Sequence, residues 1–294
     1  MDEIEGVSHY RFLTKLLDNW DEEKLTLAEK LASIARVVFL GEAPQGSLRL
    51  PFVVSVAGST HDADAITAQL DDVPLGAGLA SAAAKANAGT SRLVIPTLKP
   101  RRCAFIIPSQ VQFIAADAPT LCPDINTIGT WNIASRALSL DYLWNEVRVK
   151  NGAYGCAFQH NTAGFSAMWS YRDPAIATTL EAYKKATAWL QNWHPTCDDF
   201  EGYVVSTTAM IDAPQKPYAQ ARMLDMWYLK NRPANFNELI RTQQLHTTPA
   251  DVRSLAPYLD GDIRERCVCV FGAQEVIQKA GDLFDTVDVL IAQA

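Results

Sequence analysis

One segment of the 294-residue sequence combines residue types that could bind a peptide. In residues 141–155, a helix-like stretch runs into a strand-like one, and Arg148 precedes Tyr154 by six residues, with Gly152 and Gly155 flanking the tyrosine. Guanidinium and phenol groups both donate hydrogen bonds at neutral pH, which suits a peptide carbonyl or a developing oxyanion. The glycines would allow a substrate backbone to approach closely. An arginine in a surface ion pair and a tyrosine in a sheet are the alternative interpretation.

Motifs for metal binding and nucleophilic catalysis are missing from the sequence. The five histidines are far apart, and neither His-Glu-x-x-His nor His-x-x-Glu-His occurs. Zinc catalysis needs three protein ligands and an open position, so we expect no metal site in this chain. Cys267 and Cys269 would share one face of a strand, where a metal clip and packing in the core are the alternatives. His61 beside Asp62 resembles a triad fragment, but such adjacent pairs are common by chance.

The composition predicts an ordinary globular protein. Hydrophobic residues make up 48% and charged residues 20% of the chain, and the net charge of −7 does not indicate a nucleic-acid-binding surface. No apolar run approaches the ~20 residues that cross a bilayer. The acidic start differs from a secretory signal, and the six scattered cysteines indicate reduced thiols. We therefore expect a cytoplasmic protein that has neither nucleic acid nor membrane as a partner.

The spacing of apolar residues predicts the elements that position residues 141–155. A helix is expected at 128–144, followed by a hairpin with strands at 153–160 and 165–171 and a turn at 161–164. Thr196 and Thr248 have the sequence context of helix N-caps. The remaining predicted elements are helices at 22–39, 62–70, 174–190, 196–211, 217–230, 248–258 and 274–284, and strands at 50–56, 104–116 and 264–271.

The order of these elements predicts an α+β fold, in which helices pack on one face of a mixed β-sheet. Residues 71–102 are rich in proline, glycine and small residues, which is typical of an interdomain linker. We therefore expect one unit at 1–95, a linker end at 96–102 and a second unit at 103–294. The first unit has one predicted strand, too few for a stable sheet of its own.

Residues 104–174 resemble the second half of the pitrilysin/insulinase metallopeptidases, specifically their presequence-protease branch. The resemblance rests on Tyr142-Leu143-Trp144, on the stretch RVKNGAYG at 148–155 and on SYRDP at 170–174, and weaker similarity covers nearly the whole chain. It implies clamshell-type α+β domains: 1–95 would be the closing helix–strand–helix of an incomplete domain, and 103–294 a complete one. Asn151 departs from the branch, which usually has glycine there, although asparagine also tolerates a left-handed conformation.

The resemblance implies the non-catalytic, substrate-binding C-terminal half of a zinc-dependent metalloendopeptidase that degrades unfolded peptides in a closed chamber. Zinc would belong to the missing N-terminal half, in the same polypeptide or a partner subunit, so this chain should be inactive alone. Arg148 and Tyr154 would bind the substrate and stabilise the transition state, with Gly152 and Gly155 supporting the loop. The alternative is a catalytically silent scaffold or partner subunit of the same fold.

Overall fold

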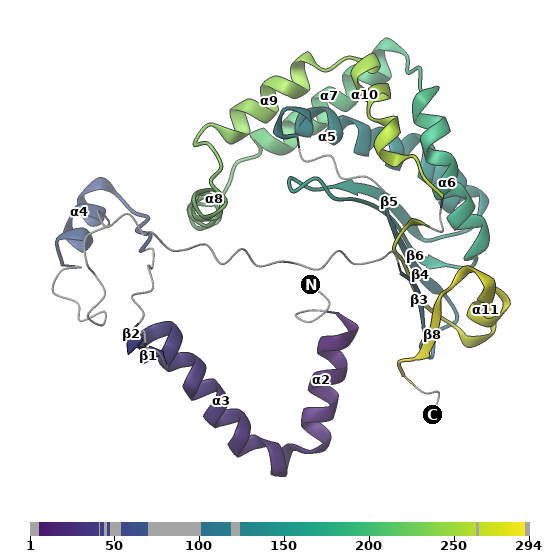
Figure 1. Ribbon diagram of the computed structural model, residues 1–294. Helices are drawn as coiled ribbons and strands as arrows, with labels where there is room; N and C mark the ends of the chain where they lie inside the picture. Colours follow the sequence, from purple (N-terminus) through teal and green to yellow (C-terminus); the bar gives the residue numbers. More distant parts are fainter. Residues whose placement is uncertain are drawn as a thin grey trace. The chain divides into compact units, whose positions relative to one another are not determined.

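The computed structural model describes residues 6–40, 42–43, 46–47, 54–69, 101–118, 124–262 and 265–291 (Figure 1). The chain separates into two compact units, Met1–Leu93 and Val94–Ala294. Residues 96–100 of the expected linker end lie outside the described ranges, and Arg102 already begins a strand. In the described ranges, no helix combines the length and the apolar character that a membrane span requires.

The described residues of the first unit form helices and one short hairpin. Its elements are α2 Val7–Asp18, α3 Trp20–Leu40, β1 Glu42–Ala43, β2 Gly46–Ser47 and α4 Thr60–Gln69. Helices α3 and α4 confirm the predictions at 22–39 and 62–70. The predicted strand at 50–56 is wrong over residues 54–56, which form no regular structure, while 50–53 lie outside the described residues. A strand needs a neighbouring strand to satisfy its backbone, and the strand pairing described in the first unit joins β1 to β2.

The second unit is built on a six-stranded mixed sheet with the order β5-β6-β4-β7-β3-β8. Strand β3 is parallel to both β7 and β8, and the other neighbours are antiparallel. The strands are β3 Arg102–Ile106, β4 Gln112–Asp117, β5 Gly155–His160, β6 Ser166–Asp173, β7 Val268–Gly272 and β8 Thr286–Val289.

Most helices of the second unit cover one face of this sheet, whereas α8 (Pro217–Leu229) stands apart from it (Figure 1). Ile114 and Val270 point to that face and are buried in the core, which confirms the predicted α+β class. The helices are α5 Ile128–Ala137, η4 Leu138–Lys150, α6 Ala177–Gln191, α7 Cys197–Asp212, α8 Pro217–Leu229, α9 Phe236–His246, α10 Pro249–Ser254 and α11 Gln274–Lys279, with single 3₁₀ turns at Ile125–Thr127, Ala256–Leu259 and Gly281–Leu283.

Helix α5 packs closely against α9 because residue 129 is a glycine. A Cβ atom at Gly129 would lie 2.5 Å from the Cβ of Gln243 and 2.9 Å from the carbonyl oxygen of Ile240, closer than packed atoms approach. The Gly129 N–H also donates a hydrogen bond to Gln243 Oε1 at 2.8 Å. This contact anchors the N-terminal end of the long helix whose other end carries Arg148.

Local hydrogen bonds confirm the predicted helix starts and the hairpin turn. Thr196 Oγ1 accepts a bond from the N–H of Asp199 at the start of α7. Thr248 and Asp251 form a reciprocal capping box at the start of α10. In the turn at 161–164, the Asn161 side chain accepts bonds from the N–H groups of Ala163 and Phe165.

Three sequence predictions are corrected by strand pairing and helix geometry. The expected strand at 104–116 is two strands, β3 and β4, separated by a turn in which Ser109 Oγ donates to the carbonyl of Val111. The helix expected at 128–144 continues to Lys150 as η4, a π-helix. The strand expected at 264–271 begins at Val268, and residue 264 lies outside the described residues. Helix α9 and strand β8 were not predicted.

The structure does not bear out core packing of Cys267 and Cys269, one of the two alternatives for this pair. Cys267 is exposed and Cys269 is half-buried. Val268 and Val270 occupy the inward positions of β7, and alternation along a strand sends the intervening residues to the opposite face.

Candidate functional site

The last turn of η4 positions Arg148. Its guanidinium carbon lies 4.0 Å from the centroid of the Trp144 ring, a cation–π contact within the same helix. The neighbouring charges Glu146 and Lys150 pair with each other at 2.5 Å. In the described part of the chain Arg148 forms no ion pair, so the structure does not show the ion-pair alternative considered from the sequence. The guanidinium rests on aromatic rings, and it retains hydrogen-bond donors for a ligand.

Gly152 turns the chain from η4 into the sheet. Its φ is +84°, a conformation that side-chain-bearing residues rarely adopt. The N–H groups of Gly152 and Ala153 donate to the carbonyls of Arg148 and Val147 and thereby close the helix end. Asn151 has φ −94°, so the left-handed position belongs to Gly152, and asparagine at 151 needs no left-handed conformation.

Tyr154 follows this turn and stands out from the sheet. Its N–H donates to the carbonyl of Tyr171 at 3.1 Å, which ties its backbone to β6. The side chain is 64% exposed, and its ring meets the Tyr171 ring edge-on at 6.0 Å. At Gly155, an added Cβ would meet no atom within 4 Å. The space beside Tyr154 is therefore open to a ligand backbone.

The turn brings Arg148 and Tyr154 together. The guanidinium carbon of Arg148 lies 5.7 Å from the centroid of the Tyr154 ring. A fixed cation and a phenol hydroxyl, both accessible and both donors, can hold one carbonyl oxygen from two sides. If that oxygen becomes negatively charged during a reaction, both hydrogen bonds strengthen, because the acceptor then carries more charge. Donors that are already aligned provide this stabilisation without the cost of reorganisation. The catalytic role of the two residues stays a prediction.

Two aromatic residues of this site, Trp144 and Tyr171, were not predicted as functional. A sequence signal existed for Trp144, since it precedes Arg148 by four residues and residues at that spacing are neighbours on a helix. Tyr171 is placed beside Tyr154 by the pairing of β5 with β6, and its ring orientation has no sequence signal.

The described residues do not fit a metal ion. Among them, no group of three His, Cys, Asp or Glu side chains gathers closely enough to hold one. A zinc ion requires such a set. The guanidinium of Arg148 has no lone pair to offer a metal ion.

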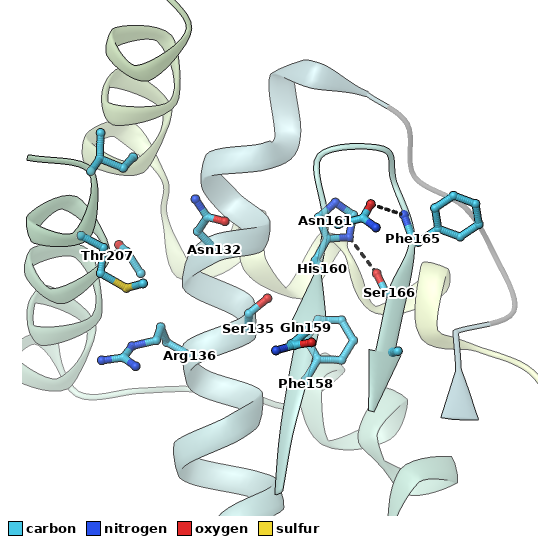
Figure 2. Close-up of a pocket in the computed structure, with 13 residues that line it drawn as sticks. Asn132, Ser135, Arg136, Phe158, Gln159, His160, Asn161, Phe165, Ser166 and Thr207 are labelled. Carbon is cyan, nitrogen blue, oxygen red and sulfur yellow. Dashed lines mark hydrogen bonds between the residues drawn. The ribbon is translucent and has the colours of Figure 1, made fainter. Parts of the chain in front are cut away.

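A separate cavity of about 670 Å³ lies between α5, α7 and the β5–β6 hairpin (Figure 2). It has the size of a small-molecule pocket. Some of its polar groups already have partners: His160 Nδ1 lies 2.7 Å from Ser166 Oγ, and Thr207 Oγ1 donates to the carbonyl of Tyr203. Ser135 Oγ likewise donates to the carbonyl of Trp131. Arg136 also lines the cavity, and its buried Nε has no hydrogen-bond partner among the described residues.

His160 in the wall of this cavity should make stability depend on pH. Burial lowers the pKa of His160 to about 4, and its ring stacks on Trp131 at 4.5 Å. Between pH 6.5 and 4 the unfolded chain binds a proton at this residue that the folded chain does not. Stability should therefore be complete above pH 6.5 and fall by up to about 2 kcal/mol towards pH 4, allowing for solvent screening.

Urea unfolding at pH 7.5, 6.0 and 4.5 tests this expectation. The stability difference between wild type and His160→Gln should shrink as the pH falls, because the variant lacks the titrating ring. His194→Gln, at an exposed position, is the matched control and should follow wild type. Parallel pH profiles for wild type and His160→Gln would show that His160 titrates normally.

Comparison with known proteins identifies relatives of this chain. Residues 102–275 match the family model described as the PreP C-terminal domain. "Protein HypA" of Clostridium perfringens is 29% identical over 181 residues, which are 62% of this chain and 19% of that protein. "Presequence protease, mitochondrial" of Mus musculus is 27% identical over 173 residues, 56% of this chain and 16% of that protein. The chain thus spans about a fifth or less of these relatives.

A solved structure shares the fold. The peptidase M16 inactive domain from Pseudomonas fluorescens superposes with a TM-score of 0.52 at 17% identity, covering 74% of this chain and 52% of that one. The family match spans more than half of the chain and includes the residues at 142–174 on which the resemblance to the presequence-protease branch rested. The chain therefore belongs to the PreP C-terminal domain family.

Proposed function

We propose that this chain is the non-catalytic, substrate-binding C-terminal half of a zinc-dependent metalloendopeptidase that cleaves unfolded peptides in a closed chamber. Family membership and the presequence-protease relatives support the peptidase context. The observation that carries the substrate-binding role is the pairing of Arg148 with Tyr154. Two accessible donors lie together beside a glycine turn and have no acidic partner among the described residues.

The chemistry assigned to the pair is hydrogen bonding to the peptide. The phenol hydroxyl of Tyr154 and the N–H groups of Arg148 would donate to the carbonyl oxygen of the scissile peptide bond. During hydrolysis this oxygen acquires negative charge, and charge-assisted hydrogen bonds are about twice as strong as neutral ones. The rings of Trp144 and Tyr171 would hold the two donors in place.

The metal belongs to the other half in this proposal. The described residues provide no set of ligands for zinc, so the N-terminal half would hold the ion. Joining the two halves would bring the Arg148–Tyr154 pair to the peptide. Residence in the cytoplasm, expected from the sequence, is part of the same proposal.

Recombination of the two halves tests the proposal. Alone, this chain should not cleave an unstructured fluorogenic peptide, and the zinc-bearing half alone should be slow. Mixing them should raise the cleavage rate on the order of tenfold or more, because the mixture regains two positioned donors. A chain with Arg148→Ala is the matched control and should restore less activity.

Two results would contradict the proposal. Chelator-sensitive cleavage by this chain alone would place the catalytic metal here. Full activity of the zinc-bearing half without this chain would reduce the chain to a silent scaffold.

A further inference from the structure

A row of aromatic side chains crosses the sheet on the face opposite the helices. Strand register places Phe105 beside Phe271 and Phe271 beside Phe113. The Phe105 and Phe271 rings stack at 5.2 Å, and the Phe113 ring meets the Tyr171 ring edge-on at 5.3 Å. Tyr171 in turn contacts Tyr154. We call Phe105, Phe271, Phe113 and Tyr171 the aromatic row.

The aromatic row points away from the core. Each member alternates along its strand with a buried residue such as Ile114 or Val270, which faces the helices. The three phenylalanines are half-buried and Tyr171 is 43% exposed. In the described part of the second unit, the helices that contribute to the core lie on the other face (Figure 1). Apolar side chains that gather on a solvent-facing surface with polar groups at its edge are typical of a binding site.

A β-bulge between β4 and β6 lies at the polar end of the row. Gln112 pairs with Asp173 whereas Ile114 pairs with Ser170, so Tyr171 and Arg172 together oppose Phe113. Arg172 has φ +51°, which is uncommon for a residue with a side chain. Bulges are over-represented beside functional sites, where they redirect a side chain. Here the bulge lies where Tyr171 meets Phe113 on one side and Tyr154 on the other.

The dimensions and polarity of the row match an extended peptide. From β5 to β3 the row crosses four strand spacings of about 4.8 Å, roughly 19 Å, which an extended chain spans with about six residues. One end carries the donors of Arg148 and Tyr154, and the rest is apolar. The charges at that end also match a peptide. Arg148 and the exposed Arg172 have no ion pair in the described residues, so both favour the carbonyl or carboxylate groups of a ligand.

We infer that the aromatic row is a subsite for an extended, unstructured peptide with large apolar side chains, and that it runs from the Arg148–Tyr154 pair across the sheet. This inference rests on the proposed function and specifies its substrate class. A folded domain that covered the row permanently would have to supply acceptors for both donors, because buried unpaired donors are costly. A peptide supplies such acceptors with every carbonyl.

Peptide binding to the 294-residue chain, followed by fluorescence anisotropy, tests the inference. The probes are a labelled twelve-residue unstructured peptide with alternating Phe and Leu, the same peptide with serine at those positions, and a four-residue apolar peptide. The long apolar peptide should bind most tightly. Phe113→Ala should raise its Kd about tenfold, because one aromatic contact is lost, and should change the Kd of the serine peptide less than twofold.

Two further variants keep the test decisive. Tyr171→Ser removes the ring at the exposed end of the row and should leave the sheet folded. It should raise the Kd of the long apolar peptide, and it replaces Phe113→Ala in the test if that variant fails to fold. Phe165→Ala is the matched control, since Phe165 is 58% exposed but lies at the hairpin turn away from the row. It should leave all three Kd values unchanged.

The outcomes separate this inference from the proposed function. Equal affinity for the long apolar and serine peptides, or no effect of Phe113→Ala and Tyr171→Ser, would overturn the inference even if recombination restores cleavage. Selective binding of the long apolar peptide that these variants weaken would support it, even if recombination restores none.

Discussion

Under the proposed function, replacement of Tyr154 by phenylalanine is expected to lower the kcat of the recombined halves on the order of 10²–10³-fold. Loss of one donor to the transition-state oxyanion typically has an effect of this size. The substitution removes one hydroxyl and keeps the ring that contacts Tyr171. KM should change little if the hydroxyl acts mainly on the charged transition state. Steady-state kinetics on an unstructured peptide provide the measurement.

The matched control for this prediction is Tyr171→Phe, which removes a hydroxyl from the neighbouring ring and should leave kcat within a few-fold of wild type. Neither variant should shift the melting temperature, because Tyr154 is mostly exposed. Near-wild-type kcat for Tyr154→Phe together with a lower melting temperature would make this tyrosine a structural residue of the sheet. The site assignment would then be wrong.

Replacement of Trp131 by alanine is expected to cause the largest loss of stability, about 3–5 kcal/mol, as for other large aromatic residues in cores. Trp131 is fully buried on α5. Its ring stacks on His160 and Phe158 and meets Tyr258 edge-on, at centroid distances of 4.5, 5.8 and 6.2 Å. Alanine would leave a cavity where helix, hairpin and the turn after α10 meet. Urea unfolding provides the measurement.

Trp144→Ala is the control for the tryptophan prediction. Trp144 is 40% exposed and its principal contact is the Arg148 guanidinium. Its removal should cost about 1 kcal/mol or less. If Trp131→Ala lost as little unfolding free energy as Trp144→Ala, the core around α5 would be able to close around the missing ring.

Local signals were sufficient for much of the fold. The N-caps at Thr196 and Thr248 and the turn at 161–164 were predicted because their hydrogen bonds join residues only two to four positions apart. The long helix from Ile128 was recognised by its apolar spacing. Its extension to Lys150 was missed, because nothing in that spacing distinguishes a π-helix from an α-helix that ends earlier.

Non-local pairing decided the rest of the fold. Residues 104–116 form an apolar stretch that suits one strand or two. It forms two because β7, more than 150 residues later in the chain, lies between β3 and β4. Strand β8 was missed for a related reason: a four-residue exposed edge strand has no pattern of its own and is defined by its parallel pairing with β3.

The candidate site shows the same division. Sequence alone determined that Arg148 and Tyr154 belong to one loop, because a helix end, a glycine and a strand start follow one another within seven residues. Tertiary structure decided what surrounds them: the bulge at Arg172 and the register of β6, β4, β7 and β3 align Tyr171, Phe113, Phe271 and Phe105 beside the pair. The physical reason is that the local sequence around a residue sets its backbone conformation. The side chains beside that residue on a sheet face depend instead on the pairing of strands that are distant in the chain.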